Sequence, residues 1–233
     1  TGGKDFVVAH PSADLDVLRT AVVRGAFEYQ GQKCSAASRA YVPASLWKRL
    51  RGDLVEVTNS LTMGDVRDLS NFMGAVIDDR AFAKHKAAID RAHASSTITV
   101  EAGGTYDDST GYFVRPTVLS GTDPNDEIFT TEYFGPILAV HVYPDRQFDR
   151  MLTQMESASP YALTGSIISQ DRSVIASVTE KLRFAAGNFY INDKPTGAVV
   201  GQQPFGGGRA SGTNDKAGSA QNLLRWTSVR SIK

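Results

Sequence analysis

Residues 5–43 read DFVVAHPSADLDVLRTAVVRGAFEYQGQKCSAASRAYVP, and this stretch decides the fold. Asp5–Ala9 is an apolar run typical of a buried strand. Ser12 is expected to cap a helix whose first turn carries Asp14 and Asp16 and whose apolar face is formed by Leu15, Leu18, Val22 and Ala26. Gly31 suits the end of that helix, and a second strand begins at Tyr41. The pattern therefore predicts strand, helix and strand in succession.

The same alternation continues along the chain. Further strands are predicted at 72–77, 97–100, 112–119, 137–143, 163–169 and 188–192, and further helices at 46–57, 79–94, 148–157 and 171–187. Alternating strands and helices are typical of an α/β fold with a mainly parallel sheet. The segment 193–218 has little periodicity and much glycine, and so long a segment inside a compact domain is either functional or disordered.

Composition excludes several classes of function. The 25 basic and 25 acidic residues of the 233-residue chain cancel, so a nucleic-acid partner or an anionic membrane surface is not expected. No apolar run approaches the length of about 18 residues that a membrane-spanning helix needs. A single cysteine cannot form an internal disulfide, which favours a reducing compartment. The four histidines show no metal-ligand spacing, so no metal is expected.

The single cysteine, Cys34, lies in the run Gly31-Gln32-Lys33-Cys34-Ser35, on a turn between the first helix and the second strand. An unperturbed thiol is only about 3 per cent thiolate at pH 7, yet this fraction supports nucleophilic chemistry. A neighbouring cation would raise the fraction, and Lys33 is adjacent. The alternative is a small buried apolar side chain. Composition alone leaves both interpretations open.

Four separated segments resemble motifs of the aldehyde dehydrogenase superfamily and occur in the family's order: 1–4 (TGGK), 31–35 (GQKCS), 132–136 (EYFGP) and 204–207 (PFGG). Finer features are similar to those dehydrogenases that oxidise glutamate 5-semialdehyde, the open form of 1-pyrroline-5-carboxylate. These features are Lys33 before the cysteine and the runs 196–205 (TGAVVGQQPF) and 210–218 (ASGTNDKAG).

The resemblance implies a three-layer αβα fold with a mainly parallel sheet, in which residues 1–212 form the catalytic domain. Residues 213–233 are then expected to contact another subunit or domain. In the family a glutamate precedes the position of Thr1, and most of the dinucleotide-binding domain lies upstream. The chain is therefore expected to be a catalytic fragment of a longer enzyme that assembles as a homo-oligomer. The expected location is the cytoplasm, or the mitochondrial matrix in a eukaryote.

The implied activity is the NAD-dependent oxidation of glutamate 5-semialdehyde to glutamate in proline catabolism. In the family's mechanism Cys34 attacks the aldehyde carbon, the thiohemiacetal passes a hydride to NAD⁺, and water hydrolyses the resulting thioester. The backbone N–H of Cys34 is available to the oxyanion. The glutamate before Thr1 is the family's base for the water, so the fragment alone is expected to be inactive.

The resemblance also assigns residues to the cofactor. Glu132 and Phe134 match residues that touch the nicotinamide half of NAD, where a carboxylate can accept from both ribose hydroxyls. Without the motif, a solvated surface acid is the favoured interpretation of Glu132, and a core aromatic is that of Phe134.

The substrate carries a carboxylate, an ammonium group and a short apolar chain. Lys33 and Ser35 are expected to supply polar contacts, the backbone amides at Gly197 and Ala198 to hold the carboxylate, and Phe205 to wall the methylenes. Relatives often carry serine where Ala198 stands, so weaker anchoring is expected.

Other classes of function stay open. The enzyme could be an aldehyde dehydrogenase for another substrate, or a papain-like cysteine hydrolase with His141 as the base. A non-catalytic scaffold with an inert, buried Cys34 is the third alternative. The hydrolase leaves the segment 132–136 and the long C-terminal run unexplained.

Overall fold

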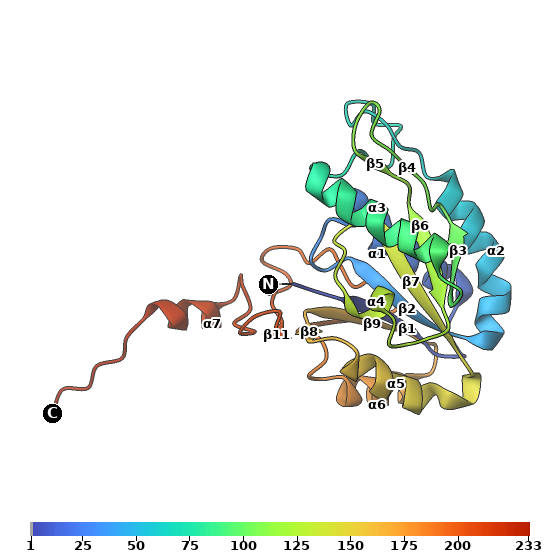
Figure 1. The fold of residues 1–233 in the computed structure, drawn as a ribbon. Coiled ribbons are helices and arrows are strands. Elements are labelled where there is room, and N and C mark those ends of the chain that lie inside the picture. Colours follow the sequence, from blue (N-terminus) through green and yellow to red (C-terminus); the bar gives the residue numbers. More distant parts are fainter. Residues whose placement is uncertain (1) are drawn as a thin grey trace.

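The computed structural model describes residues 2–233, whose centre is a seven-stranded sheet. Its strands are β1 (Asp5–Ala9), β2 (Ala37–Pro43), β3 (Ile98–Ala102), β6 (Thr117–Gly121), β7 (Ile137–Tyr143), β9 (Thr164–Ile168) and β10 (Asn188–Ile191). Their order in space is β10-β9-β1-β2-β7-β6-β3 (Figure 1). Neighbouring strands are parallel, except that β3 is antiparallel to β6. The predicted α/β fold with a mainly parallel sheet is confirmed.

Helices cover both faces of the sheet. The two helices on one face are α1 (Leu15–Phe27) and α2 (Ala44–Ser60), and those on the other are α3 (Asp79–Ala94), α4 (Glu127–Thr130), α5 (Phe148–Ser157) and α6 (Arg172–Lys181). Side chains alternate accordingly, since Val7 of β1 packs with α1 and α2 whereas Phe6 packs with α5 and α6. The three-layer arrangement is confirmed. None of the helices within residues 2–233 is long and apolar enough to cross a bilayer.

Smaller elements complete the chain. Two short antiparallel pairs join β4 (Tyr106–Asp107) to β5 (Phe113–Val114) and β8 (Tyr161–Ala162) to β11 (Gly208–Arg209). Short 3₁₀ helices are η1 (Glu28–Gly31), η2 (Asp145–Gln147) and η3 (Leu224–Trp226), and α7 (Ala220–Leu223) precedes the last of them.

The start of α1 differs from the prediction. Its cap is Asp14, whose Oδ1 accepts the backbone N–H groups of Asp16 at 2.9 Å and Val17 at 3.0 Å. A carboxylate satisfies the free N–H groups of the first turn and also favours the positive end of the helix dipole. The hydroxyl of Ser12 instead lies 2.9 Å from His10 Nδ1 and 2.9 Å from Ser169 Oγ. The prediction of Ser12 as the cap was wrong.

Two strand predictions also need correction. Residues 72–77 form a loop, in which the N–H groups of Phe72 and Met73 both donate to the carbonyl of Thr62. The predicted strand 112–119 is divided into β5 and β6. Pro116 lies between them and has no N–H to donate, so a continuous ladder is interrupted there.

The parallel direction of the strands brings several segments to one edge of the sheet. Gly3 precedes β1, Cys34 precedes β2, Gly135 precedes β7, and Thr164 begins β9, so all four lie at the amino ends of neighbouring strands. The segment 192–206 returns from the carboxyl end of β10 to this edge, where Gly206 N–H donates to the side chain of Asn188. The candidate site is assembled at this edge.

The C-terminal segment leaves the body of the molecule (Figure 1). Phe205 and Ala217 exchange two backbone hydrogen bonds of 2.9 and 2.7 Å, and these hold the start of the segment. Beyond Ala217 the large apolar side chains are exposed: Leu223, Leu224, Trp226, Val229 and Ile232. The boundary at residue 212 and the contact of 213–233 with another subunit or domain stay predictions.

The packing of β9 against β1 provides a stability test. A Cβ at Gly165 would lie 2.1 Å from the ring of Phe6, which is 1 % exposed. Gly165→Ala is therefore expected to lower the free energy of unfolding by about 2 kcal/mol, measured by urea unfolding. Gly52→Ala in α2 is the control, because its Cβ would meet open space and helix propensity predicts a gain of about 0.5–1 kcal/mol. Equal effects of the two substitutions would contradict the packing argument.

Candidate active site

Cys34 is half-buried on the turn before β2 and lines two hollows at once. The larger, of about 450 Å³, is lined by Lys33, Cys34, Ser35, Thr196, Gly197, Ala198, Val200, Gln203, Phe205, Ala217 and Gly218. The smaller is lined mainly by residues before β1, β2 and β7: Gly3, Gly31, Lys33, Cys34, Ala36, Ala37, Ser38, Glu132, Tyr133, Phe134, Gly135 and Ile137. Cys34 therefore lies between a hollow walled largely by residues 196–218 and a narrow one walled by the segments before β1, β2 and β7.

A strained turn delivers Cys34 to this position. Tyr29, Gln30 and Gly31 have φ values of 54°, 57° and 63°, so three successive residues adopt the left-handed conformation. Gly31 tolerates no side chain, because a Cβ would lie 2.4 Å from the carbonyl oxygen of Gly135. The Gln30 amide donates to the carbonyl of Ala75 at 3.0 Å and so helps to hold the turn. Strain of about 1–3 kcal/mol per residue is commonly found at functional sites.

The electrostatics of the thiol differ from the expectation. Burial raises the pKa of Cys34, and the Asp5 carboxyl group raises it further, while the backbone N–H groups of Cys34 and Ser35 act in the opposite direction. Lys33 does not offset this, because its ammonium group donates to Glu28 at 3.1 Å. The expectation that Lys33 increases the thiolate fraction is not met in this structure.

Glu28 is the centre of an ion cluster that the sequence did not indicate. Its carboxylate accepts from Arg24 at 2.7 Å, from Lys33 at 3.1 Å and from Lys194 at 2.9 Å. Partial burial favours the protonated form, but hydrogen bonds from Lys194 and Lys33 outweigh it and lower the pKa of Glu28. Because Lys194 follows β10, the cluster ties the segment 192–206 to the cysteine turn.

A second contact joins the same two segments. Ser35 Oγ lies 2.7 Å from Thr196 Oγ1, and both residues are buried. Gly197 then turns the chain with φ of 98°, which favours glycine at this position. The larger hollow thus brings the nucleophile candidate together with all the residues predicted to contact the substrate: Lys33, Ser35, Gly197, Ala198 and Phe205.

Glu132 and Phe134 flank the smaller hollow. Glu132 Oε1 accepts the N–H of Gly3 at 2.9 Å, so this carboxylate is not a freely solvated acid. Phe134 is 43 % exposed with φ of 57°, which rules out the interpretation as a core aromatic. His85 of α3 is fully buried beneath this segment, with Nε2 3.0 Å from the carbonyl oxygen of Tyr133. This supporting role was not predicted from the sequence.

The smaller hollow is a narrow crevice of about 10 Å³ that is flanked by Glu132 and Phe134. A Cβ at Gly3, Gly31 or Gly135 would lie within 2.4 Å of a neighbouring protein atom, so these glycines allow close packing of the segments around the hollow. Glu132 has acceptor capacity beyond its bond to Gly3, because a carboxylate can accept about four hydrogen bonds. Together with the exposed Phe134 ring, the hollow offers an acceptor for a diol and a flat apolar surface.

The structure separates His141 from Cys34. His141 lies opposite Tyr41 in the pairing of β2 with β7, and its ring packs at 5.9 Å from Tyr41 and 5.7 Å from Phe129. Tyr41 is about 13 Å along the strand from Ala37, where β2 begins. A cysteine–histidine pair of the papain type is therefore not formed.

Two other histidines are used in packing. His85 supports the segment before β7, and His93 Nε2 lies 2.8 Å from the carbonyl oxygen of Gly104. Across the described part of the chain, no three His, Cys, Asp or Glu side chains gather in a way that could hold a metal ion.

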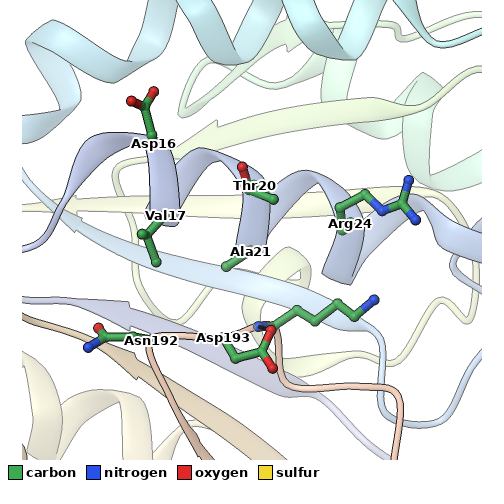
Figure 2. A pocket seen from close by; sticks show the side chains of 8 residues that line it. Asp16, Val17, Thr20, Ala21, Arg24, Asn192 and Asp193 are labelled. Carbon is green, nitrogen blue, oxygen red and sulfur yellow. Dashed lines mark hydrogen bonds between the residues drawn. The ribbon is translucent and has the colours of Figure 1, made fainter.

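A further hollow of about 500 Å³ lies between α1 and the segment after β10. Figure 2 shows Asp16, Thr20 and Arg24 projecting from α1 on one side, with Asn192 and Asp193 on the other. It is slightly larger than the hollow at Cys34, but none of the predicted site residues lines it. Arg24 and Lys194 join it to the site, since both reach Glu28.

Lys4 is an unusual cation beneath the site. It is 2 % exposed, its Nζ lies 5.1 Å from the centre of the Tyr133 ring, and it has no hydrogen-bond partner among residues 2–233. Burial and the nearby Arg39 guanidinium lower the pKa of Lys4 to about 7, against the opposing effects of Glu132 and Asp5. The folded state therefore holds the proton of Lys4 weakly.

Comparison with known proteins extends over the whole chain. Residues 1–232 match the model of the family described as "Aldehyde dehydrogenase family". The zebrafish (Danio rerio) protein named "Delta-1-pyrroline-5-carboxylate dehydrogenase, mitochondrial" is 51 % identical over 233 residues, which cover 100 % of this chain and 42 % of the relative. The chain thus spans about two fifths of the length of the curated relatives it matches.

Solved structures give the same result. The Delta-pyrroline-5-carboxylate dehydrogenase from Mycobacterium tuberculosis superposes with a TM-score of 0.93 at 62 % identity, covering 100 % of this chain and 43 % of that one. The 1-pyrroline-5-carboxylate dehydrogenase from Thermus, solved with bound NAD, superposes with a TM-score of 0.85 at 34 % identity, covering 96 % and 42 %. Thr1, the first residue of the matching glycine motif, lies outside the described residues.

The lowered pKa of Lys4 predicts a pH-dependent stability. Because the folded pKa lies below the unfolded value of about 10.4, the unfolded chain binds more protons between pH 7 and pH 10, and the stability contributed by Lys4 rises with pH across this window. From pH 7 to pH 9 the free energy of unfolding of the wild type is expected to rise by about 2 kcal/mol relative to that of Lys4→Met. Urea unfolding at several pH values measures it, with Lys48→Met as the control for losing an exposed ammonium. A constant difference would contradict the assignment.

Proposed function

The chain belongs to the aldehyde dehydrogenase family, and we propose that the full-length protein oxidises glutamate 5-semialdehyde to glutamate with NAD. The observation that carries the proposal is the position of Cys34, which lines a substrate-sized hollow on one side and a narrow crevice flanked by Glu132 and Phe134 on the other. The relatives named delta-1-pyrroline-5-carboxylate dehydrogenase support glutamate 5-semialdehyde as the aldehyde.

The proposed chemistry begins at the sulfur. The thiolate of Cys34 adds to the aldehyde carbon, a C–S bond forms, and the carbonyl electron pair moves to oxygen, where the backbone N–H of Cys34 donates to the oxyanion. When the C=O bond re-forms, the carbon loses a hydride and the adduct becomes a thioester. Water then adds to the thioester, and the Cys34 thiolate leaves as the acid is released.

The surface formed by Glu132 and Phe134 beside the smaller hollow is proposed to contact the nicotinamide half of NAD. NAD, when bound, supplies the acceptor for the hydride. Glu132 is proposed to accept hydrogen bonds from ribose hydroxyls, and Phe134 to pack beside the sugar and base. The bond from Gly3 N–H to Glu132 Oε1 supports this role, because it fixes the carboxylate before any ligand arrives.

The larger hollow is proposed to hold the amino-acid end of the substrate. The backbone amides at Gly197 and Ala198 are assigned to the carboxylate, and Phe205 to the methylene groups. Ser35 and Lys33 already have protein partners, Thr196 and Glu28, so we assign them to holding the shape of the hollow as well as to polar contact. The methyl group of Ala198 leaves only backbone donors at its position.

Assembly and location follow as further proposals. The exposed apolar side chains between 223 and 232 would be covered by a second copy, which makes residues 213–233 the contact segment of a homo-oligomer. Residues 1–212 are the proposed catalytic domain, completed by a dinucleotide-binding part. The zebrafish relative is named as mitochondrial, so we propose the mitochondrial matrix in a eukaryote and the cytoplasm in a bacterium.

Replacement of the nucleophile tests the covalent chemistry. Cys34→Ser in the full-length protein is expected to lower turnover of glutamate 5-semialdehyde at least a thousandfold, because a hydroxyl is a much poorer nucleophile at neutral pH. NAD binding, measured by calorimetry, should remain within about twofold of wild type. Turnover of even a tenth of the wild-type rate would overturn the proposal.

The carboxylate role of the 196–205 loop is tested at Gly197. Gly197→Val is expected to raise KM for glutamate 5-semialdehyde more than tenfold, because a branched side chain blocks close approach to the backbone and disfavours φ of 98°. Propanal, which has no carboxylate, should be affected less. Gly201→Val is the matched control, since Gly201 also has a positive φ of 82° but is absent from the lining of the larger hollow. Equal losses for both aldehydes would contradict carboxylate anchoring.

A further inference from the structure

A buried carboxyl group beside Cys34 takes no part in the chemistry above. Asp5 is the first residue of β1 and is 2 % exposed. Its Oδ1 accepts the N–H of Thr164 at 2.6 Å, whereas its Oδ2 finds no hydrogen-bond partner in the described part of the chain. Burying an ionised carboxylate with one oxygen unpaired is costly, and a protonated carboxyl group avoids most of that cost.

The unpaired oxygen packs against the cysteine turn. A Cβ at Gly3 would lie 2.3 Å from Asp5 Oδ2 and 2.1 Å from the carbonyl oxygen of Cys34, so both groups pack against Gly3. Thr164 strengthens the link, since its hydroxyl donates to the carbonyl of Ser35 at 3.4 Å. Asp5 on β1 and Thr164 on β9 therefore support the turn that carries the thiol.

The charged groups around Asp5 influence whether its carboxyl group is ionised. Arg39 on β2 and Lys4 on the same segment are the nearby cations, and Glu132 before β7 is the nearby anion. Burial holds the pKa of Asp5 well above its usual range, against the Thr164 N–H group and Arg39. An ionised Asp5 is in turn the largest cause, after burial, that raises the pKa of Cys34.

We propose that Asp5 is a positioning residue that acts through Cys34: the two acids lie at one edge of the sheet, and a negative charge on the Asp5 carboxyl group opposes formation of the Cys34 thiolate. A proton on Asp5 removes this opposition, and loss of that proton favours the protonated thiol. This inference rests on the proposed role of Cys34 as the nucleophile, and it adds the group that sets when that nucleophile is charged.

Alkylation of the thiol tests the inference without aldehyde or NAD. Iodoacetamide is added to the full-length protein from pH 6 to pH 10, where the Cys34 thiolate displaces iodide and forms a C–S bond. Mass spectrometry of the tryptic peptide 34–39 (CSAASR) reports the rate at this residue alone. Asp5→Asn keeps an acceptor for Thr164 but removes the charge, Asp5→Ala removes both, and Asp107→Asn on the exposed β4 is the control.

Both Asp5 variants are expected to lower the midpoint of the alkylation profile by about one pH unit, with the control unchanged. The rate at pH 7 should rise about fourfold, because roughly tenfold more thiolate is partly offset by the lower nucleophilicity of a more acidic thiol. An unchanged midpoint in Asp5→Asn would overturn the inference, whether or not Asp5→Ala shifts, since the hydrogen bond alone would then explain any effect. If the proposed oxidation is wrong, Cys34→Ser will keep its turnover of glutamate 5-semialdehyde. The alkylation measurement uses no aldehyde and does not depend on that result.

Discussion

The site depends on a direct backbone contact between the segment before β1 and the turn before β2. Gly3 lies against the carbonyl group of Cys34, and a single added carbon atom would come within 2.1 Å of that oxygen. The same glycine donates its N–H to Glu132, so one residue without a side chain aligns the nucleophile with the cofactor-binding candidate. The parallel sheet makes this contact possible, because it brings the amino ends of β1, β2 and β7 to one edge.

The second half of the site is attached by side chains instead. The Glu28 cluster and the bond between Ser35 and Thr196 join the segment after β10 to the cysteine turn. The strained residues 29–31 are stabilised in the same place, since Gly31 packs against Gly135 and Gln30 is bonded to Ala75. Polar contacts thus set the width of the larger hollow, whereas backbone contacts set that of the smaller one.

The sequence predicted those elements in which local pattern and tertiary packing agree. The ranges 79–94, 137–143 and 148–157 were found with the predicted bounds, because their periodicity and turn residues are unambiguous. Ser12 failed as a cap because the carboxylate of Asp14 accepts the N–H groups of the first turn, and 72–77 failed because an apolar run also suits a packed loop. The motifs predicted the residues that meet at Cys34. They gave no sign of Glu28, Asp5 or His85, whose partners lie far away in the chain or depend on burial.

The returning segment after β10 has a consequence for synthesis. Cys34 is made before the distant residues that wall its larger hollow, which run from Thr196 to Gly218. At ribosomal rates of about 5–20 residues per second, the thiol spends on the order of 10 s without that wall. During this interval the nascent chain offers an uncovered sulfur to any oxidant or electrophile in the cell. Burial of Cys34 is also incomplete then, so its pKa is raised less than in the finished fold. The finished fold therefore protects a sulfur that is exposed in the growing chain.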